Sequence, residues 1–331
     1  MRRDPSPATR RQLRCAMATM VLTSLAWPAA GQSLPLLHPA NPVGESRSGL
    51  YFQPTVSAGP GWRIAVGLDY ASMVELGLRY SSVDTSYLLD AETLRLNLSL
   101  SRDLGPRTFV LAEAWAGGSY GGFLDGFLNW YHGLFGINFP ERELRPAGRF
   151  DYRYKFADNR LVRFEPHAVY LGDVRLGIGR RVLHGVQSVL SLTLPTHTGG
   201  AGYGRGVPSI SLLNTARAQV APRLVLEGSA NIGWTPRHGL LSTVQEQLFV
   251  LGTAGLRWRT IGSVWSFGNL YLHSPYYSGT EAGQLDNWDL TVDFGWIVRS
   301  GSGREFRFGM TEDLRPGGPA IDTNFRLGVN W

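Results

Sequence analysis

The chain has 331 residues, of which 43% are hydrophobic, 11% aromatic and 18% charged. This composition is too apolar and too aromatic for a disordered chain, and the single cysteine excludes a disulfide scaffold and a cysteine-based zinc or iron–sulfur centre. The formal net charge of +6 falls to about +2 beyond residue 31, because residues 1–31 hold five arginines and one aspartate. That balance leaves no basic patch for nucleic acid, which we exclude as a partner.

Residues 1–31 have the organisation of a secretory signal peptide. A basic start is followed by an apolar stretch, Ala16–Trp27, and then by small residues that include Ala30 and Gly31. The apolar stretch is shorter than the roughly 20 residues of a membrane-spanning helix, which disfavours an uncleaved anchor. We expect cleavage near Ala30 or Gly31, so that Cys15 is removed and the mature chain contains no cysteine.

Residues 32–60 are rich in proline, which fixes the backbone and removes a hydrogen-bond donor. The prolines include Pro35, Pro39, Pro42 and Pro54. We expect an irregular lead-in here, in the periplasm or in the lumen of the fold described next, with a strand near 49–57 as an alternative.

From residue 61 onward, apolar and polar residues alternate along most of the chain. In residues 94–100, for example, leucine stands at every even position, with Arg95, Asn97 and Ser99 in between. A period of two is typical of a strand with one apolar and one polar face. The pattern predicts twelve strands, at 62–74, 86–102, 107–119, 171–181, 186–196, 208–219, 222–235, 245–258, 263–273, 287–299, 303–314 and 321–331.

Strand length and loop pattern favour a transmembrane barrel over a soluble sandwich. Many predicted strands have ten or more residues, enough to cross a bilayer at a tilt, and tryptophans gather near their ends. Short connections alternate with long ones, as periplasmic turns and external loops do in outer-membrane barrels. We predict an all-β fold, a transmembrane antiparallel β-barrel of about 12 strands over residues 61–331, in the bacterial outer membrane. Its expected partners are outer-membrane lipid and the barrel-assembly machinery, through the C-terminal strand that ends at Trp331.

The connection at residues 120–170 has a different pattern. Aromatic residues and leucine recur at helical spacing over Phe123–Phe135, which predicts a short amphipathic helix, and residues 150–157 and 161–169 predict a hairpin. The insert is expected to be a lid outside the barrel, a plug in the lumen, or packing that fills the mouth. The candidate gate residues are Phe123, Asp125, Phe127, Asn129, Trp130, His132 and Phe135.

Charged residues occur on the polar face of the predicted strands, where they would line the lumen. Their mixed signs suggest a network of internal ion pairs in a narrow barrel, and the alternative is a polar pathway for solutes. The candidates are Arg63, Asp69, Arg95, Asp173, Arg175, Arg217, Glu227, Arg257, Asp289, Asp293, Glu305, Arg307 and Arg326.

Four segments resemble a known family, in the same order along the chain. They are GFLDGFLNWYHGLFG at 122–136, LLDAETLRL at 88–96, LGDVRLG at 171–177 and LPT at 194–196. Together they are similar to the bacterial domain of unknown function 3187 family over residues 35–331. The resemblance implies an outer-membrane fold and implies no activity. The family often continues the LPT segment with Gly-Asp, whereas this chain has His197 and Thr198 there.

The sequence predicts neither catalysis nor a metal or cofactor site. His273 and Ser274 are adjacent but have no third partner, and Asp125 lies about 10 Å along a helix from His132, too far to orient it. The glycine-rich residues 199–206 lie between predicted strands with no helix after them, so we expect a flexible loop there and not a phosphate site.

These patterns lead to three hypotheses about function. The first is a channel or transporter for small or amphipathic solutes, gated by the 120–170 insert. The alternative is a closed structural or interaction barrel that binds a partner through its outer loops. A membrane hydrolase is the third, and it would need a Ser–His pair brought together across strands.

Overall fold

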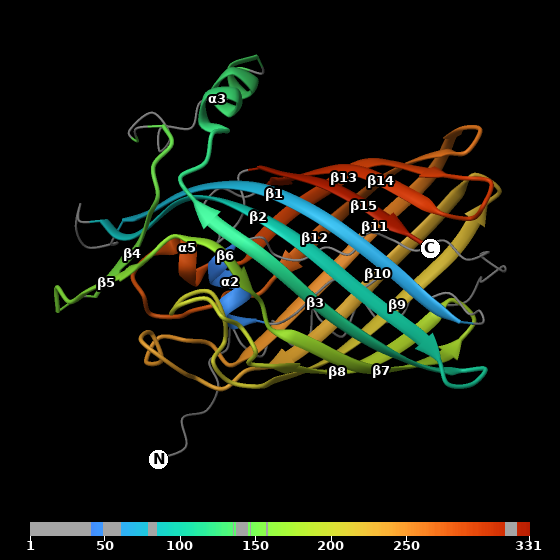
Figure 1. Cartoon of the computed structure of the whole chain (residues 1–331), viewed down its shortest axis with the longest axis horizontal. Coiled ribbons are helices and arrows are strands. Elements are labelled where there is room, and N and C mark those ends of the chain that lie inside the picture. Colours follow the sequence, from blue (N-terminus) through green and yellow to red (C-terminus); the bar gives the residue numbers. More distant parts are fainter. Residues whose placement is uncertain are drawn as a thin grey trace, which may run out of the picture.

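The computed structural model describes residues 41–48, 61–78, 85–134, 136, 145, 147–156, 158–314 and 323–331. Twelve antiparallel strands form a closed barrel (Figure 1), because the first barrel strand pairs with the last. The barrel strands are β1 (Trp62–Leu78), β2 (Thr85–Asp103), β3 (Thr108–Tyr120), β7 (Val174–Leu183), β8 (Val186–Leu194), β9 (Ser209–Ala221), β10 (Leu224–Trp234), β11 (Leu248–Ile261), β12 (Val264–His273), β13 (Asp289–Arg299), β14 (Glu305–Asp313) and β15 (Thr323–Asn330). Every other barrel strand pairs with the barrel strands that precede and follow it in the chain, so that β3 pairs with β7 across the insert.

The predicted barrel is confirmed, including its number of strands. Short turns join β2 to β3, β7 to β8, β9 to β10, β11 to β12 and β13 to β14, all at the end where β1 begins and β15 finishes. Figure 1 shows this end on the right and the longer connections on the left. We call the short-turn end the periplasmic end and the other the outer end, following the general pattern of such barrels.

The two faces of the sheet are reversed relative to a soluble protein. On β2, Leu96 is 52% exposed whereas its neighbour Arg95 is only 2% exposed. The same alternation on the other strands puts apolar side chains outside and polar ones inside. The hydrocarbon core of a membrane requires this arrangement, because an apolar belt can face lipid while the charged side chains pair in the lumen. Exposed tryptophans near strand ends are Trp62, Trp234, Trp258, Trp296 and Trp331.

In its described residues, the insert between β3 and β7 contains a helix and three short strands. Helix α3 (Asp125–Leu134) lies within the predicted helix, whose last residue, Phe135, is outside the described residues. Strands β4 (Asp151–Lys155) and β5 (Leu161–Phe164) form the predicted hairpin, and β4 also pairs with the outer part of β2. The predicted hairpin arm at 161–169 is too long, because β6 (His167–Leu171) leaves it and pairs with β3.

A second helix, α2 (Pro42–Arg47), lies inside the outer half of the barrel (Figure 1), in the segment for which we expected irregular structure. Asn41 begins it, accepting a 2.9 Å hydrogen bond from the Val43 N–H, and Pro42 occupies the first helical position. All six of its residues are buried. The signal peptide and the alternative strand near 49–57 lie outside the described residues. None of the helices in the described ranges is long and apolar enough to cross a membrane.

Candidate functional site

A group of buried side chains, here called the cap cluster, lies at the outer end of the barrel. They come from α2, the β4–β5 hairpin, the connection between β10 and β11, and the connection that contains α5 (Gly283–Asp286), together with the outer ends of β1, β2 and β11. The cluster is rich in tyrosine and phenylalanine, which fill space and exclude water. Its members include Val43, Tyr87, Tyr152, Tyr154, Phe164, Leu241, Phe249, Tyr276, Tyr277 and Leu285.

Polar contacts hold α2 in this position. Glu45 forms a buried ion pair with Arg95 of β2, and the Arg47 guanidinium donates to the carbonyl oxygens of Pro236 at 3.2 Å and Glu246 at 2.7 Å. Burial raises the pKa of Glu45 to about 7, although the nearby Arg95 opposes this shift. A buried charge of this kind is tolerated only while its partner stays in place.

The long insert is anchored on the opposite side of the same strand. Glu92 stands at an outward position of β2, and its carboxylate accepts hydrogen bonds from the Leu124 N–H at 2.6 Å and the Tyr70 hydroxyl at 2.5 Å. Gly122 has φ +69°, and a Cβ there would lie 1.9 Å from Cδ of Glu92. Asp90, also outward, receives the Arg145 guanidinium at 2.9 Å. Two carboxylates of the LLDAET segment therefore fasten the insert to the outer wall.

Helix α3 lies against the outside of the barrel wall and does not fill the mouth. The ring of Phe123 lies 5.3 Å from that of Tyr70, and the ring of Phe127 lies 6.1 Å from that of Phe325. Tyr70 on β1 and Phe325 on β15 are outward-facing residues. Trp130 is 60% exposed. The expectation of a plug in the lumen or of packing that fills the mouth is therefore wrong for α3, because the anchor that fixes its start faces outward; a lid outside the barrel stays a prediction.

The other candidate gate residues share this location on the outer wall. The Asp125 carboxylate accepts a 2.7 Å hydrogen bond from the Gly148 N–H, which joins the helix to the following chain. Asn129 is exposed, whereas His132 is 4% exposed. The buried side chains of α3 are Leu128 and His132, whereas Phe127 and Trp130 are exposed. No observation on these residues tests a gating role.

Inside the barrel, the charged candidates form ion pairs between strands. Arg175 donates to Glu113 at 2.7 Å and Arg326 donates to Asp69 at 2.8 Å. Asp173 lies at the break between β6 and β7 and binds Arg205 at 2.9 Å. The candidates that are buried inside are Asp69, Arg95, Asp173, Arg175, Arg217, Glu227, Arg257, Asp293, Glu305 and Arg326, and the partly buried ones are Arg63, Asp289 and Arg307.

Asp173 also holds His197, which follows the LPT segment. Its carboxylate accepts from the His197 N–H at 3.1 Å and lies 3.2 Å from His197 Nδ1. Although burial opposes it, the hydrogen bond from His197 and the charge of Arg205 lower the pKa of Asp173. The connection between β8 and β9 is therefore folded back onto a carboxylate from another of the recognised segments, where we expected a flexible loop.

Several interior charges escaped the sequence prediction. Asp103 and Arg181 lie on inward positions at the periplasmic ends of their strands and pair at 2.8 Å, with Arg63 also at 2.7 Å from Asp103. The alternation of β2 and β7 places both of these side chains inside. Glu45 and Arg205 lie outside the strands, where no alternation indicates which way a side chain points.

Arginines outnumber carboxylates at the periplasmic end of the lumen. Within four residues of the periplasmic strand ends, the inward positions of the described strands carry eight arginines and three carboxylates. The imbalance is hidden in the sequence because the remaining carboxylates lie deeper. These residues are Arg63, Arg181, Arg217, Arg257, Arg259, Arg299, Arg307 and Arg326, with Asp103, Glu227 and Glu305.

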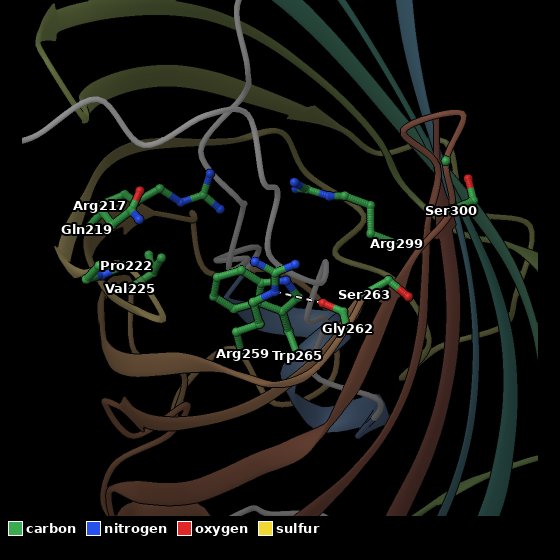
Figure 2. Close-up of a pocket in the computed structure, with 11 residues that line it drawn as sticks. Arg217, Gln219, Pro222, Val225, Arg259, Gly262, Ser263, Trp265, Arg299 and Ser300 are labelled. Carbon is green, nitrogen blue, oxygen red and sulfur yellow. Dashed lines mark hydrogen bonds between the residues drawn. The ribbon is translucent and has the colours of Figure 1, made fainter.

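A cavity of about 440 Å³ opens among these arginines, and we call it the mouth cavity. Figure 2 shows Arg217 and Arg299 reaching into it from different strands, with Arg259 beside the ring of Trp265. Val225 adds an apolar wall.

The hydrolase hypothesis gains nothing from His273 and Ser274. The His273 ring faces inward and its Nδ1 lies against the Ser274 carbonyl oxygen, while the Ser274 hydroxyl accepts a 3.0 Å bond from the Val250 N–H. Each side chain is therefore engaged with the backbone, and the serine is not held by the histidine as a nucleophile would be.

The closed barrel with apolar side chains outside and ion pairs inside defines a β-barrel of the outer-membrane type. Its similarity to a solved outer-membrane barrel supports this class: the structure aligns with the COG4313 outer membrane channel from Pseudomonas putida F1 with a TM-score of 0.54 and 12% identity, covering 83% of this chain and 96% of that one. The family model described as "Protein of unknown function (DUF3187)" matches residues 52–331, and the chain belongs to this family.

Two further solved structures have lower similarity. The translocator domain of autotransporter NalP from Neisseria meningitidis gives a TM-score of 0.44 at 11% identity, covering 83% of this chain and 89% of that one. The toluene transporter TodX of Pseudomonas putida gives 0.40 at 11% identity, covering 93% and 98%. No curated protein matches the chain.

Proposed function

We propose that the protein is an outer-membrane channel for small solutes, closed at its outer mouth by α2 and the β4–β5 hairpin. The observation that carries the proposal is the placement of α2, a separate segment seated inside the barrel by a few polar contacts. Side chains alone fill small barrels, and twelve strands leave an interior wide enough for such a segment. Moving α2 would enlarge the lumen without breaking the barrel wall.

The hairpin of the 120–170 insert shares this gating role in the proposal. Tyr152, Tyr154 and Phe164 pack in the cap cluster with Val43 of α2, so the hairpin and the helix close the mouth together. The solutes are small or amphipathic, because the outer end presents aromatic side chains and the periplasmic end presents guanidinium groups.

Export and insertion are part of the same proposal. The signal peptide would be removed near Ala30 or Gly31, and the barrel-assembly machinery would recognise the last strand, which ends at Trp331. The exposed apolar belt would then face outer-membrane lipid. Mass spectrometry of the protein purified from outer membranes would give the first residue of the mature chain.

Single-channel current in a planar bilayer tests the channel directly. The refolded chain from residue 32 should give rare, small steps, and deletion of residues 41–48 should give frequent, larger ones. Deletion of residues 123–134 is the matched control, because α3 lies on the outer wall, and it should leave the current unchanged.

Silence would contradict the channel if all three proteins are folded, as judged by strand content in circular dichroism and by heat-modifiable migration in electrophoresis. Silence would favour a closed barrel that binds a partner through its outer loops. The cap cluster gives that second candidate its support, since it seals the outer mouth with closely packed aromatic side chains.

A further inference from the structure

We propose that the mouth cavity binds a small anion, one that carries a phosphate or carboxylate group next to an apolar or aromatic portion. This inference rests on the proposed function in one respect, since it names the class of solute that would pass. It can be tested separately, because a ligand can bind in the mouth cavity, at the periplasmic end, while the outer end stays closed.

The first argument is that the guanidinium groups exceed their carboxylate partners. Glu227 serves two arginines, with Arg217 Nε at 2.5 Å and Arg257 Nε at 3.3 Å. Within the described part of the chain, Nη2 of Arg217, a residue that lines the cavity, is buried without a hydrogen-bond partner. Buried charged donors that lack an acceptor are costly, and an anionic ligand would supply the acceptor.

Arg259 adds a donor that faces the open part of the cavity. Its Nε donates to the Gly262 carbonyl oxygen at 2.7 Å, which fixes the side chain across the β11–β12 turn and directs the guanidinium (Figure 2). Arg299, on the other side, is paired with Glu305 at 2.7 Å. The guanidinium groups of Arg217, Arg259 and Arg299 therefore converge on the mouth cavity. Within the described residues, Arg217 pairs with Glu227 and Arg299 with Glu305, and Arg259 has no carboxylate partner.

The second argument is the apolar wall. Trp265 and Val225 line the same cavity and are 9% and 4% exposed. A planar indole beside guanidinium groups suits a ligand with a ring or hydrocarbon part next to its charge, because the ring can stack while the charge is bound. The volume of about 440 Å³ falls in the range of small-molecule sites.

Binding of phenyl phosphate to the full mature chain in nonionic detergent, measured by isothermal titration calorimetry, tests the inference. Phenyltrimethylammonium is the matched cationic probe and inorganic phosphate lacks the ring. We expect saturable binding of phenyl phosphate, weaker binding of inorganic phosphate, and none of the cation. Equal binding of the two aromatic probes, or no binding of phenyl phosphate, would overturn the inference.

The variant Arg259→Gln locates the site without disturbing an ion pair. It should weaken phenyl phosphate binding on the order of tenfold, the effect of losing one charged hydrogen bond. Arg223→Gln is the control, since it removes the same charge from an exposed arginine in the neighbouring β9–β10 turn, outside the cavity lining. Equal loss in both variants would mean non-specific attraction and would contradict a built site.

The outcomes of the two proposals are distinguishable. Binding of phenyl phosphate through Arg259 by a protein that stays silent in bilayers would support the anion site and contradict the channel. A protein that conducts after deletion of residues 41–48 but binds no anion would retain the channel and lose the inference.

Discussion

Helices α2 and α3 lie on opposite sides of the same barrel wall, and their anchors are three residues apart on β2. Arg95 points inward and holds α2 in the lumen through Glu45, whereas Glu92 points outward and holds the start of α3 through the Leu124 N–H. Because successive residues of a strand face opposite sides, an odd separation puts the two helices in different surroundings.

The composition of each helix matches the side on which it lies. All six residues of α2 are buried, and it offers charged groups to the polar lumen, whereas α3 exposes Phe127 and Trp130 outside the wall. In a water-soluble protein the aromatic helix would be the one inside. In a barrel with a polar interior and an apolar exterior, the anchor residue on β2 and the composition of the helix therefore point to the same side.

Replacing Arg95 is expected to have the largest effect on the docking of the two helices. The variant Arg95→Met leaves the carboxyl of Glu45 buried without its ion-pair partner, and this is destabilising at pH 8, where that carboxyl is ionised in the docked helix. We expect α2 to leave its site, so that the amides of residues 43–47 exchange hydrogen at least a hundredfold faster. The double variant with Glu45→Gln should recover most of the protection; no recovery would mean that the pair does not hold α2.

Replacing Glu92 should release α3 and leave α2 in place. The variant Glu92→Ala removes the acceptor of the Leu124 N–H and the Tyr70 hydroxyl, at a cost of roughly 1–3 kcal/mol. Hydrogen exchange should accelerate at residues 124–132 alone. Faster exchange in α2 as well would show that the two helices are coupled and would contradict their independent anchoring.

A substitution at Gly122 tests the same anchor from the insert side. Gly122→Ala places a methyl group against Glu92 and forces alanine to φ +69°, so we expect a loss of roughly 1–2 kcal/mol in the attachment of α3. Gly126→Ala is the control, because nothing lies within 4 Å of its added Cβ and alanine favours a helix. Equal behaviour of the two variants in α3 exchange would contradict the close fit at Gly122.

The pH dependence of α2 docking should be the smallest effect. The pKa of Glu45 is about 7 when α2 is docked and near its ordinary value of 4.5 when it is free, so proton binding favours the docked state. Docking should therefore weaken as pH rises through 7, on the order of tenfold between pH 6 and pH 8. Exchange rates of α2, corrected for the intrinsic effect of pH, measure this. Glu45→Gln should abolish the dependence; a dependence of opposite sign would contradict the assignment.

The barrel could be predicted because its surroundings impose a strict alternation on the sequence. Leu94, Leu96 and Leu98 fix the outward face of β2, and the same rule places Arg95 and Asn97 inside. Strand number and the side of the short turns followed from repeating that rule. The helical spacing of 123–135 likewise found α3, since that period differs from two.

The position of both helices could not be predicted from their own residues. The sequence of segment 32–60 shows no hydrophobic periodicity, so it does not indicate that α2 lies in the lumen. It also does not indicate to which side the Glu45 side chain points. For α3 a signal was present and unused: Glu92 shares the outward face with three leucines, and a carboxylate facing lipid must be covered by something. The excess of arginine at the periplasmic end was hidden because it depends on depth along the strands.

Cysteine labelling on both helices tests most directly that α2 lies inside and α3 outside. A chain starting at residue 32 contains no cysteine of its own, so Ser46→Cys and Trp130→Cys each give a single thiol. In lipid bilayers, Trp130→Cys should react with a lipid-soluble maleimide and resist a charged one, and Ser46→Cys should resist both until Arg95→Met is added. Rapid reaction of Ser46→Cys with the charged reagent in the otherwise unchanged chain, or protection of Trp130→Cys from the lipid-soluble one, would contradict the placement.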